Sequence, residues 1–145
     1  MQKYERTCLD EIDFENAAQM HAAALQLSQT CFDFKKLCVS LLGASSALLI
    51  KFGSGGFSHA VFFVGVLLIF GFWLSDATSY FYQRKLRSGI SAKHRSIAKR
   101  NGQEIELRDT TTSPIHAAFN SSMALYYVLA GVFAVGWLAY GVGAL

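Results

Sequence analysis

The stretch FSHAVFFVGVLLIFGFWLS, residues Phe57 to Ser75, runs for nineteen residues without a formal charge and is followed by the polar sequence Asp76-Ala77-Thr78-Ser79. An uncharged run of this length predicts a transmembrane helix, because lipid offers the backbone no hydrogen bonds and a spanning segment must satisfy its own. At about 1.5 Å per residue, the run just crosses a bilayer core of roughly 30 Å. We therefore expect a membrane protein.

Two further apolar stretches decide how often the chain crosses. Met123 to Leu145 is free of charge over twenty-three residues and predicts a second span. Leu37 to Ile50 is shorter, with fourteen residues between Lys36 and Lys51, and by length alone it equally suits a buried or interfacial helix. Lysine side chains at both ends can reach the water layer, which favours a third span. The glycine-rich connector Gly53-Ser54-Gly55-Gly56 suits a tight hairpin between two of these helices.

The basic residues define an orientation. Twelve of the thirteen Lys and Arg residues precede the first span or lie between the last two, and only Lys51 falls on the other side. Positive residues favour the cytoplasmic side of a membrane. We expect a multi-pass membrane protein, with the N-terminus and the basic connector in the cytoplasm and the C-terminus outside.

Helical extensions are predicted on the cytoplasmic side. The stretch 10–36 contains no glycine or proline and is rich in Ala, Leu and Gln, so it should run as a helix into the first span. The stretch 76–100 contains a single glycine, Gly89, and should continue the second span outward. The first stretch is acidic and the second is basic, so the two should attract each other as a stalk.

The fold expected is therefore an all-α membrane protein with three transmembrane helices and helical cytoplasmic extensions. Its parts are an amphipathic cytoplasmic helix (1–36), a transmembrane hairpin (37–76), a basic cytoplasmic helix and connector (77–114) and a C-terminal transmembrane helix (115–145). Within the connector, Pro114 after Ser113 predicts a helix start, and the alternation of polar and apolar residues over 103–108 favours a short strand.

Small residues crowd the last span, where Ala130 and Ala134, and Ala139 and Gly143, stand four residues apart. Such residues let helices approach closely, and one helix needs only one such face within its own chain. We therefore expect a homo-oligomer, which in membranes is usually a ring. If the ring leaves an axial path, the hydroxyls of Ser40, Ser45 and Ser46 are the candidate lining; the alternative is that they bond back to their own helix carbonyls.

A basic stripe is predicted on the second cytoplasmic helix, where Arg84, Arg87, Ser91, His94 and Arg95 share one face. One interpretation is contact with anionic lipid or a solvated positive-inside segment. The other is a site for a nucleotide or short nucleic acid, formed where the stripes of several subunits converge, and here arginine's planar fork suits phosphate. The candidate ligand-binding residues are Arg84, Lys85, Arg87, His94 and Arg95.

Enzymatic chemistry finds little support. Arg87 and His94 fit the loose spacing of arginine, six residues and histidine seen in HEPN ribonucleases, yet the sequence offers no carboxylate pair, catalytic triad order or phosphate-binding glycine loop. Cys8, Cys31 and Cys38 lack metal-ligand spacing. We expect no enzyme, no metal and no cofactor.

The sequence Phe72-Trp-Leu-Ser-Asp-Ala-Thr-Ser-Tyr-Phe-Tyr-Gln-Arg84, at the end of the second span, resembles the SLATT-type effectors, small bacterial membrane proteins of anti-phage defence. The resemblance covers about residues 30 to 100, and its signature positions are Trp73, Asp76, Tyr80, Gln83 and Arg84. It implies a membrane hairpin that forms a pore or disrupts the membrane, controlled by the nucleotide product of a partner nucleotidyltransferase. In layout the chain is similar to the membrane effector of the Hailong system, implied to be an ion channel controlled by DNA oligomers. The third span is an addition to the simplest two-span pattern.

The sequence thus predicts an oligomeric ion channel or pore that acts as a toxic effector in abortive infection, gated by a nucleotide or oligonucleotide in a basic vestibule. The alternative is a non-conducting membrane anchor or assembly subunit, whose acidic N-terminal helix and basic connector dock a soluble partner.

Overall fold

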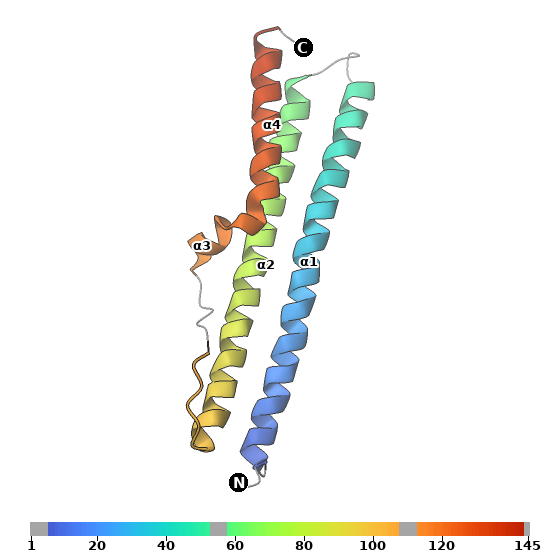
Figure 1. Cartoon of the computed structure of the whole chain (residues 1–145). Helices are drawn as coiled ribbons and strands as arrows, with labels where there is room; N and C mark the ends of the chain where they lie inside the picture. The colour runs from blue at the N-terminus through green and yellow to red at the C-terminus, as the bar shows by residue number, and fades with distance from the viewer. Residues whose placement is uncertain (1–5, 53–57, 108–112, 144–145) are drawn as a thin grey trace.

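The fold is a long helical hairpin with a shorter helix packed against one end (Figure 1). The structure, a computed structural model, describes residues 6–52, 58–107 and 113–143. Its elements are α1 (Cys8–Phe52), α2 (His59–Arg100), α3 (Pro114–Ala118), the 3₁₀ turn η1 (Ser121–Met123) and α4 (Ala124–Gly141). No strand occurs among these residues, so the all-α prediction is confirmed.

Helices α1 and α2 run antiparallel, side by side, over their whole length (Figure 1). Their 45 and 42 residues correspond to about 68 and 63 Å, roughly twice the thickness of a bilayer core. The prediction that both apolar segments continue outward as helices is therefore confirmed. We call residues 8–36 of α1 and 76–100 of α2 the stalk.

A seven-residue repeat holds α1 against α2. In α1 the repeat places one buried residue in every second turn, at Asp10, Ala17, Ala24, Cys31 and Cys38. In α2 the same spacing links the buried residues Phe62, Ile69, Asp76 and Gln83, and the buried Ile97 follows two repeats later. A strict seven-residue spacing is the signature of two helices in a left-handed coiled coil, and the small side chains of α1 allow close approach. The sequence analysis did not detect this repeat.

Helix α4 packs against the half of α2 remote from the stalk, and α3 projects to the side at the level where α4 begins (Figure 1). Two aromatic rings meet glycines across this contact. The ring of Phe133 covers Gly65, where an added Cβ would lie 2.0 Å from its Cε1 atom, and the ring of Phe62 lies against Gly136. Gly65 and Gly136 therefore serve close helix packing within the chain, whereas Gly43, Gly71, Gly131 and Gly141 face open space.

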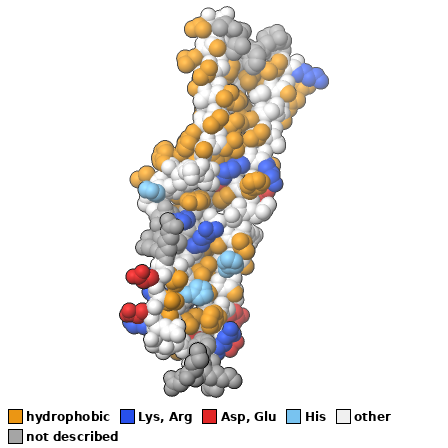
Figure 2. All heavy atoms as spheres, viewed as in Figure 1, with side chains coloured by type: hydrophobic (Ala, Val, Ile, Leu, Met, Phe, Trp, Pro, Cys, Tyr) orange, Lys and Arg blue, Asp and Glu red, His pale blue; other side chains and the backbone are white. Residues whose placement is uncertain are grey.

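Two segments are long and apolar enough to cross a membrane, His59–Arg100 and Ser121–Gly141. This statement rests on length and composition alone. In Figure 2 the half of the molecule that contains α4 displays mainly hydrophobic side chains, whereas nearly all charged side chains on this face lie in the other half. The apolar part of α1 does not meet the same criterion, because it is bounded by Lys36 and Lys51.

The connector between α2 and α4 differs from the predictions. Helix α3 begins at Pro114 with Ser113 as its cap, as expected, and the Ser113 hydroxyl accepts a hydrogen bond from the backbone N–H of His116. The chain then turns at Phe119 and Asn120 and starts α4 at Ala124, so a single helix from residue 115 onward was wrong. Residues 103–107 form no strand. The predicted glycine hairpin at 53–56 lies outside the described residues.

Candidate functional site

The predicted ligand-binding residues do not form one pocket within a single chain. Helix α2 distributes them over separate surfaces, two of which border α1. Arg87 lines a groove against α1, Lys85 lines a second hollow beside Met20 and Tyr82, and Arg95 lies against residues 105–107. The stripe therefore forms the border of a helix pair, and a shared site would need groups from more than one chain.

The groove at Arg87 combines the most suitable groups for an anion. It has a volume of about 280 Å³ and lies between the two helices of the stalk. Its polar groups are Arg87 and Ser91 from α2 and His21 from α1, and its floor is apolar. A guanidinium, an imidazole and a hydroxyl are the side chains that bind phosphate oxygens. His21 was not predicted; the antiparallel register that places it opposite Arg87 could have been derived from the seven-residue repeats.

Two other predicted residues, His94 and Arg84, lie partly buried in the stalk. The His94 ring meets the Phe14 ring of α1 edge-on, with centroids 6.2 Å apart. The Arg84 Nε atom is buried and has no hydrogen-bond partner among the described residues. Of the five predicted residues, Lys85, Arg87 and Arg95 are exposed.

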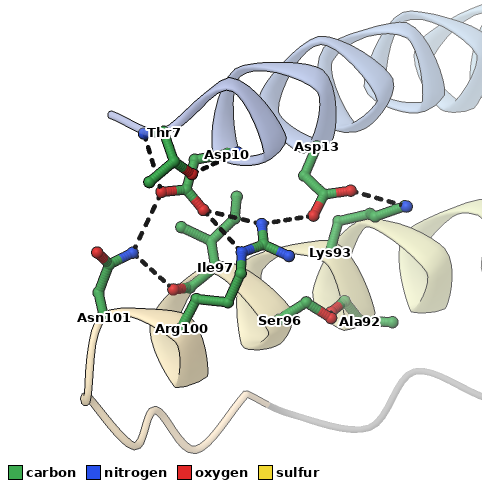
Figure 3. Close-up of polar contacts among 9 residues, drawn as sticks. All are labelled: Thr7, Asp10, Asp13, Ala92, Lys93, Ser96, Ile97, Arg100 and Asn101. Atoms are coloured by element: carbon green, nitrogen blue, oxygen red, sulfur yellow. Dashed lines mark hydrogen bonds and ion pairs between the residues drawn. The ribbon is translucent and has the colours of Figure 1, made fainter. Parts of the chain in front are cut away.

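An ionic cluster closes the far end of the stalk (Figure 3). The Arg100 guanidinium donates from Nε to Asp10 Oδ1 at 2.9 Å and from Nη2 to Asp13 Oδ2 at 2.6 Å. The Lys93 ammonium donates to the other oxygen of Asp13 at 2.8 Å. We call Asp10, Asp13, Lys93 and Arg100 the tip latch. The latch confirms that the acidic N-terminal segment and the basic connector attract each other.

The tip latch lies between the start of α1 and the end of α2, and a neighbouring side chain caps each of these helix ends. Thr7 precedes α1, and its hydroxyl accepts a hydrogen bond from the Asp10 N–H while its own N–H donates to Asp10 Oδ2, which forms a capping box. Asn101 caps α2 and donates from its side chain to the carbonyl of Ile97 and to Asp10. A carboxylate at a helix N-terminus and a guanidinium at a helix C-terminus each complement the helix dipole.

The tip latch depends on ionised carboxylates. Burial raises the pKa of Asp10, but the hydrogen bonds from Arg100, Thr7 and Asn101 outweigh it and bring the pKa down to about 2. The hydrogen bonds from Lys93 and Arg100 likewise lower the pKa of Asp13. Both carboxyls bind protons less readily in the latch than in an unfolded chain, so the latch is intact at neutral pH.

A second ion pair lies where α1, α2 and α4 meet. The Lys35 ammonium of α1 donates to Asp76 Oδ2 of α2 at 2.5 Å, and the Asp76 side chain is 0% exposed. The Lys35 Nζ atom also lies 5.8 Å from the centre of the Tyr126 ring of α4. We call Lys35, Asp76 and Tyr126 the junction.

The junction contains unsatisfied polar atoms. Asp76 Oδ1 and the Tyr126 hydroxyl are both buried, and neither makes a hydrogen bond to the described residues. Both groups lie beside the Lys35 ammonium, which pairs with Asp76 and faces the Tyr126 ring. A buried carboxylate with one bare oxygen is costly, which makes the junction a sensitive point of the fold. The sequence analysis did not identify Lys35 as the partner of Asp76.

The other signature positions face neighbouring helices. Trp73 donates from its indole nitrogen to the carbonyl of Ala118 at 3.1 Å, which ties α3 to α2. Gln83 donates to the carbonyl of Ala24 across the stalk at 3.4 Å, and Tyr80 packs against the core at the junction. These side chains connect neighbouring helices of the chain.

The candidate pore-lining serines are divided. Ser40 is exposed, and Ser45 and Ser46 are half-buried. The Ser45 hydroxyl donates to the carbonyl of Leu42 at 3.3 Å, which matches the alternative that these hydroxyls bond to their own helix. A lining role for the three serines remains a prediction for an assembly of several chains.

Comparison with protein-family models, curated proteins and solved structures found no match. The described residues contain no group of three or more His, Cys, Asp or Glu side chains that could hold a metal ion.

Proposed function

We propose that this protein is an oligomeric ion channel or pore of the bacterial inner membrane, gated by a phosphate-rich ligand at its cytoplasmic stalk. The observation that carries the proposal is the continuity of α2, which runs unbroken from His59 to Arg100. One helix thus contains both an apolar segment able to cross a bilayer and the exposed basic residues Lys85, Arg87 and Arg95. A change in the spacing of the stalks moves the membrane segments directly, because the same helices form both.

Three crossings are supported by the hairpin. Helix α1 lies beside α2 over its whole length, so its apolar segment at residues 37–50 lies at the same depth as the first half of α2. If α2 crosses the bilayer, α1 crosses with it, and Lys36 and Lys51 extend their ammonium groups to the two water layers. The tip of the stalk and the N-terminus then lie on the cytoplasmic side.

A homo-oligomer is supported by the surface that one chain leaves uncovered. Most of α4 is exposed, and the glycines Gly43, Gly71, Gly131 and Gly141 have no atoms near them. Three spans cannot enclose a hydrated path, whereas several copies packed on such faces can.

The ligand proposed is a nucleotide or short DNA oligomer, made by a partner nucleotidyltransferase as the SLATT resemblance implies. Arg87, with Arg84, Lys85, His94 and Arg95 along the same helix, supplies one strip of positive charge per subunit. A polyanion bridging several strips offsets their mutual repulsion, and it shifts the population between open and closed states if these differ in the spacing of the stalks. Opening would collapse the ion gradients of the infected cell and end phage replication with it.

The rival function is a non-conducting anchor that docks a soluble partner through its acidic N-terminal helix. The tip latch speaks against it, because Asp10 and Asp13 are already paired with Arg100 and Lys93 of the same chain.

The test uses bacteria that express the protein, with membrane potential followed by a voltage-sensitive dye. Wild-type protein should depolarise the cells in a manner that depends on the nucleotide product. The triple variant R84Q/R87Q/R95Q should keep its membrane content but lose that dependence. A single-charge control, K99Q, removes an exposed cation that is not among the five candidate ligand-binding residues. An anchor would leave the membrane potential unchanged in every one of these strains.

A further inference from the structure

A second apolar seam runs along α1, one residue after the seam that contacts α2. Its large members repeat every seven residues at Leu25, Phe32 and Val39, which are 55%, 59% and 49% exposed. Ala18 continues the repeat into the stalk, and Ala22 and Gly43 stand four residues after Ala18 and Val39, respectively. We call these six residues the outer seam. Leu25, Phe32 and Val39 occupy one position of each seven-residue repeat, as one line of contact positions does in a coiled coil, while the positions four residues later are Gln29, Lys36 and Gly43.

The stalk part of this seam is unusual for a surface in water. From Asn16 to Phe32 the chain carries no Asp, Glu, Lys or Arg, although most of these residues are exposed. Solvated helices normally carry charges on their outer face, and exposed Leu and Phe at helical spacing indicate a contact surface. The groove beside Leu25, of about 280 Å³, adds a hollow that can accept a side chain.

The course of the outer seam identifies what covers it. Val39 and Gly43 lie in the apolar segment of α1. Leu25 lies ten residues before Lys35 in the same helix, which places it about 15 Å from the Lys35–Asp76 pair, toward the tip of the stalk. Lipid covers only the first part and a soluble protein covers only the second. A covering helix must cross the bilayer and continue into the cytoplasm, as α1 and α2 of this chain do.

We infer that the outer seam of α1 is the interface with a second copy of this chain. The seam has the same seven-residue period as the contact between α1 and α2 and directly adjoins it, so a neighbouring copy extends the same left-handed packing. Gly43 has open space around it, which permits close approach of the neighbour inside the membrane. This inference rests on the proposed function in one respect, namely that the protein works as an oligomer.

The interface also has a consequence for ligand binding. Arg87 and His21 line the same groove as Leu25. Packing at Leu25 therefore brings the Arg87 side chain of each subunit next to the stalk of its neighbour. The phosphate-binding strips of adjacent subunits converge along this line, which supplies the shared site that one chain lacks.

The first experiment places the photo-crosslinking residue benzoylphenylalanine at position 25 in the full-length protein in membranes. Irradiation should yield a product with the mass of two copies, confirmed by co-purification of two differently tagged chains. Position 26 is the matched control, because Gln26 is exposed and points about 100° away around the same helix. Equal dimer yields at both positions, or products of position 25 that contain only another protein or lipid, would overturn the inference.

The second experiment compares L25E/F32E with Q19E/Q26E by native mass spectrometry in detergent. Each variant adds two glutamates seven residues apart to α1, at exposed positions. L25E/F32E should lose the oligomer while its helical circular dichroism is retained, and Q19E/Q26E should keep the oligomer. If wild-type protein is oligomeric and L25E/F32E assembles equally well, the outer seam is not the interface but the proposed function stands. If wild-type protein is monomeric in membranes and in detergent, both are refuted.

Discussion

The tip latch and the junction both join a buried aspartate to a cation across the same pair of helices, yet their hydrogen bonding differs. At the tip, Asp10 and Asp13 share Arg100, Asp13 also pairs with Lys93, and Thr7 and Asn101 add further hydrogen bonds. At the junction, Asp76 meets one ammonium group and keeps a bare oxygen.

The two ion pairs therefore have different roles in the hairpin. A fully hydrogen-bonded network sets the register of two helix ends, and it can open when its carboxylates are protonated. A buried pair contributes little net stability while intact, but it makes the fold intolerant of losing either partner. The tip is therefore suited to regulation, and the junction to fixing the position of α4 against the hairpin.

The largest effect is expected at the junction. D76A leaves the Lys35 ammonium buried without its partner and should destabilise the fold by about 3–5 kcal/mol. Thermal unfolding in detergent, followed by circular dichroism, measures this change. The double variant K35M/D76L removes both charges and should recover most of the loss. If D76A unfolds with the wild-type midpoint, the pair does not carry the buried charge described here.

Two glycines of α2, Gly65 and Gly71, test whether α4 packs on α2 as described. G65A places a Cβ against the Phe133 ring and should cost about 1–3 kcal/mol through overpacking, whereas G71A meets open space and should be neutral or slightly stabilising. The two tryptophans, Trp73 and Trp137, lie at the contacts of α2 with α3 and α4. Their fluorescence should shift in G65A and not in G71A. Identical spectra and midpoints for the two variants would contradict the packing of α4 on Gly65.

The tip should respond more mildly. R100Q removes the shared cation and should let the two helix ends separate without unfolding the hairpin. Cys8 is exposed while Cys31 and Cys38 are buried, so a spin label on Cys8 can be paired with one on Q103C. The distance distribution between the labels should broaden in R100Q. It should stay narrow in K99Q, which removes an exposed neighbouring cation outside the latch; equal distributions in both would mean that the latch does not hold the tip.

Acid should also open the tip latch, and we expect this to be the smallest of the four effects. The pKa of Asp10 is lowered from 3.8 to about 2, so its stabilising effect is complete above about pH 4 and is lost as the pH falls toward 2. The same label pair should broaden over that interval in wild-type protein. The R100Q variant should show a smaller change, since its latch is already open. A wild-type transition centred near pH 6 would point to histidine and not to these carboxylates.

The sequence alone predicted the helices well, because long runs without proline and abrupt changes in charge are local features. It predicted that the two halves of the stalk attract each other, but not that Asp10 pairs with Arg100 or Asp76 with Lys35. Those pairings depend on register, and the register follows from the seven-residue repeat of Ala17, Ala24, Cys31 and Cys38. Their small side chains do not stand out as a hydrophobic pattern, so the repeat was missed.

The break before α4 was missed for a different reason. Asn120 accepts a hydrogen bond from the N–H of Ser122 and donates to the carbonyl of Ala117, which replaces helical bonds by a side-chain cap. Asn120, Ser121 and Ser122 are polar, but whether such residues interrupt a helix depends on partners such as Trp73, whose indole binds the carbonyl of Ala118. The candidate ligand site was divided for a similar reason, since the face shared by Arg84 and His94 also borders α1.

The most direct test of a ligand-gated channel is the conductance of purified, full-length protein in a planar lipid bilayer, recorded with and without short DNA oligomers on the stalk side. We predict discrete current steps whose open probability changes at least several-fold on addition of the oligomers, with no such change in R84Q/R87Q/R95Q. A bilayer that contains the assembled protein and stays silent under both conditions would contradict the account.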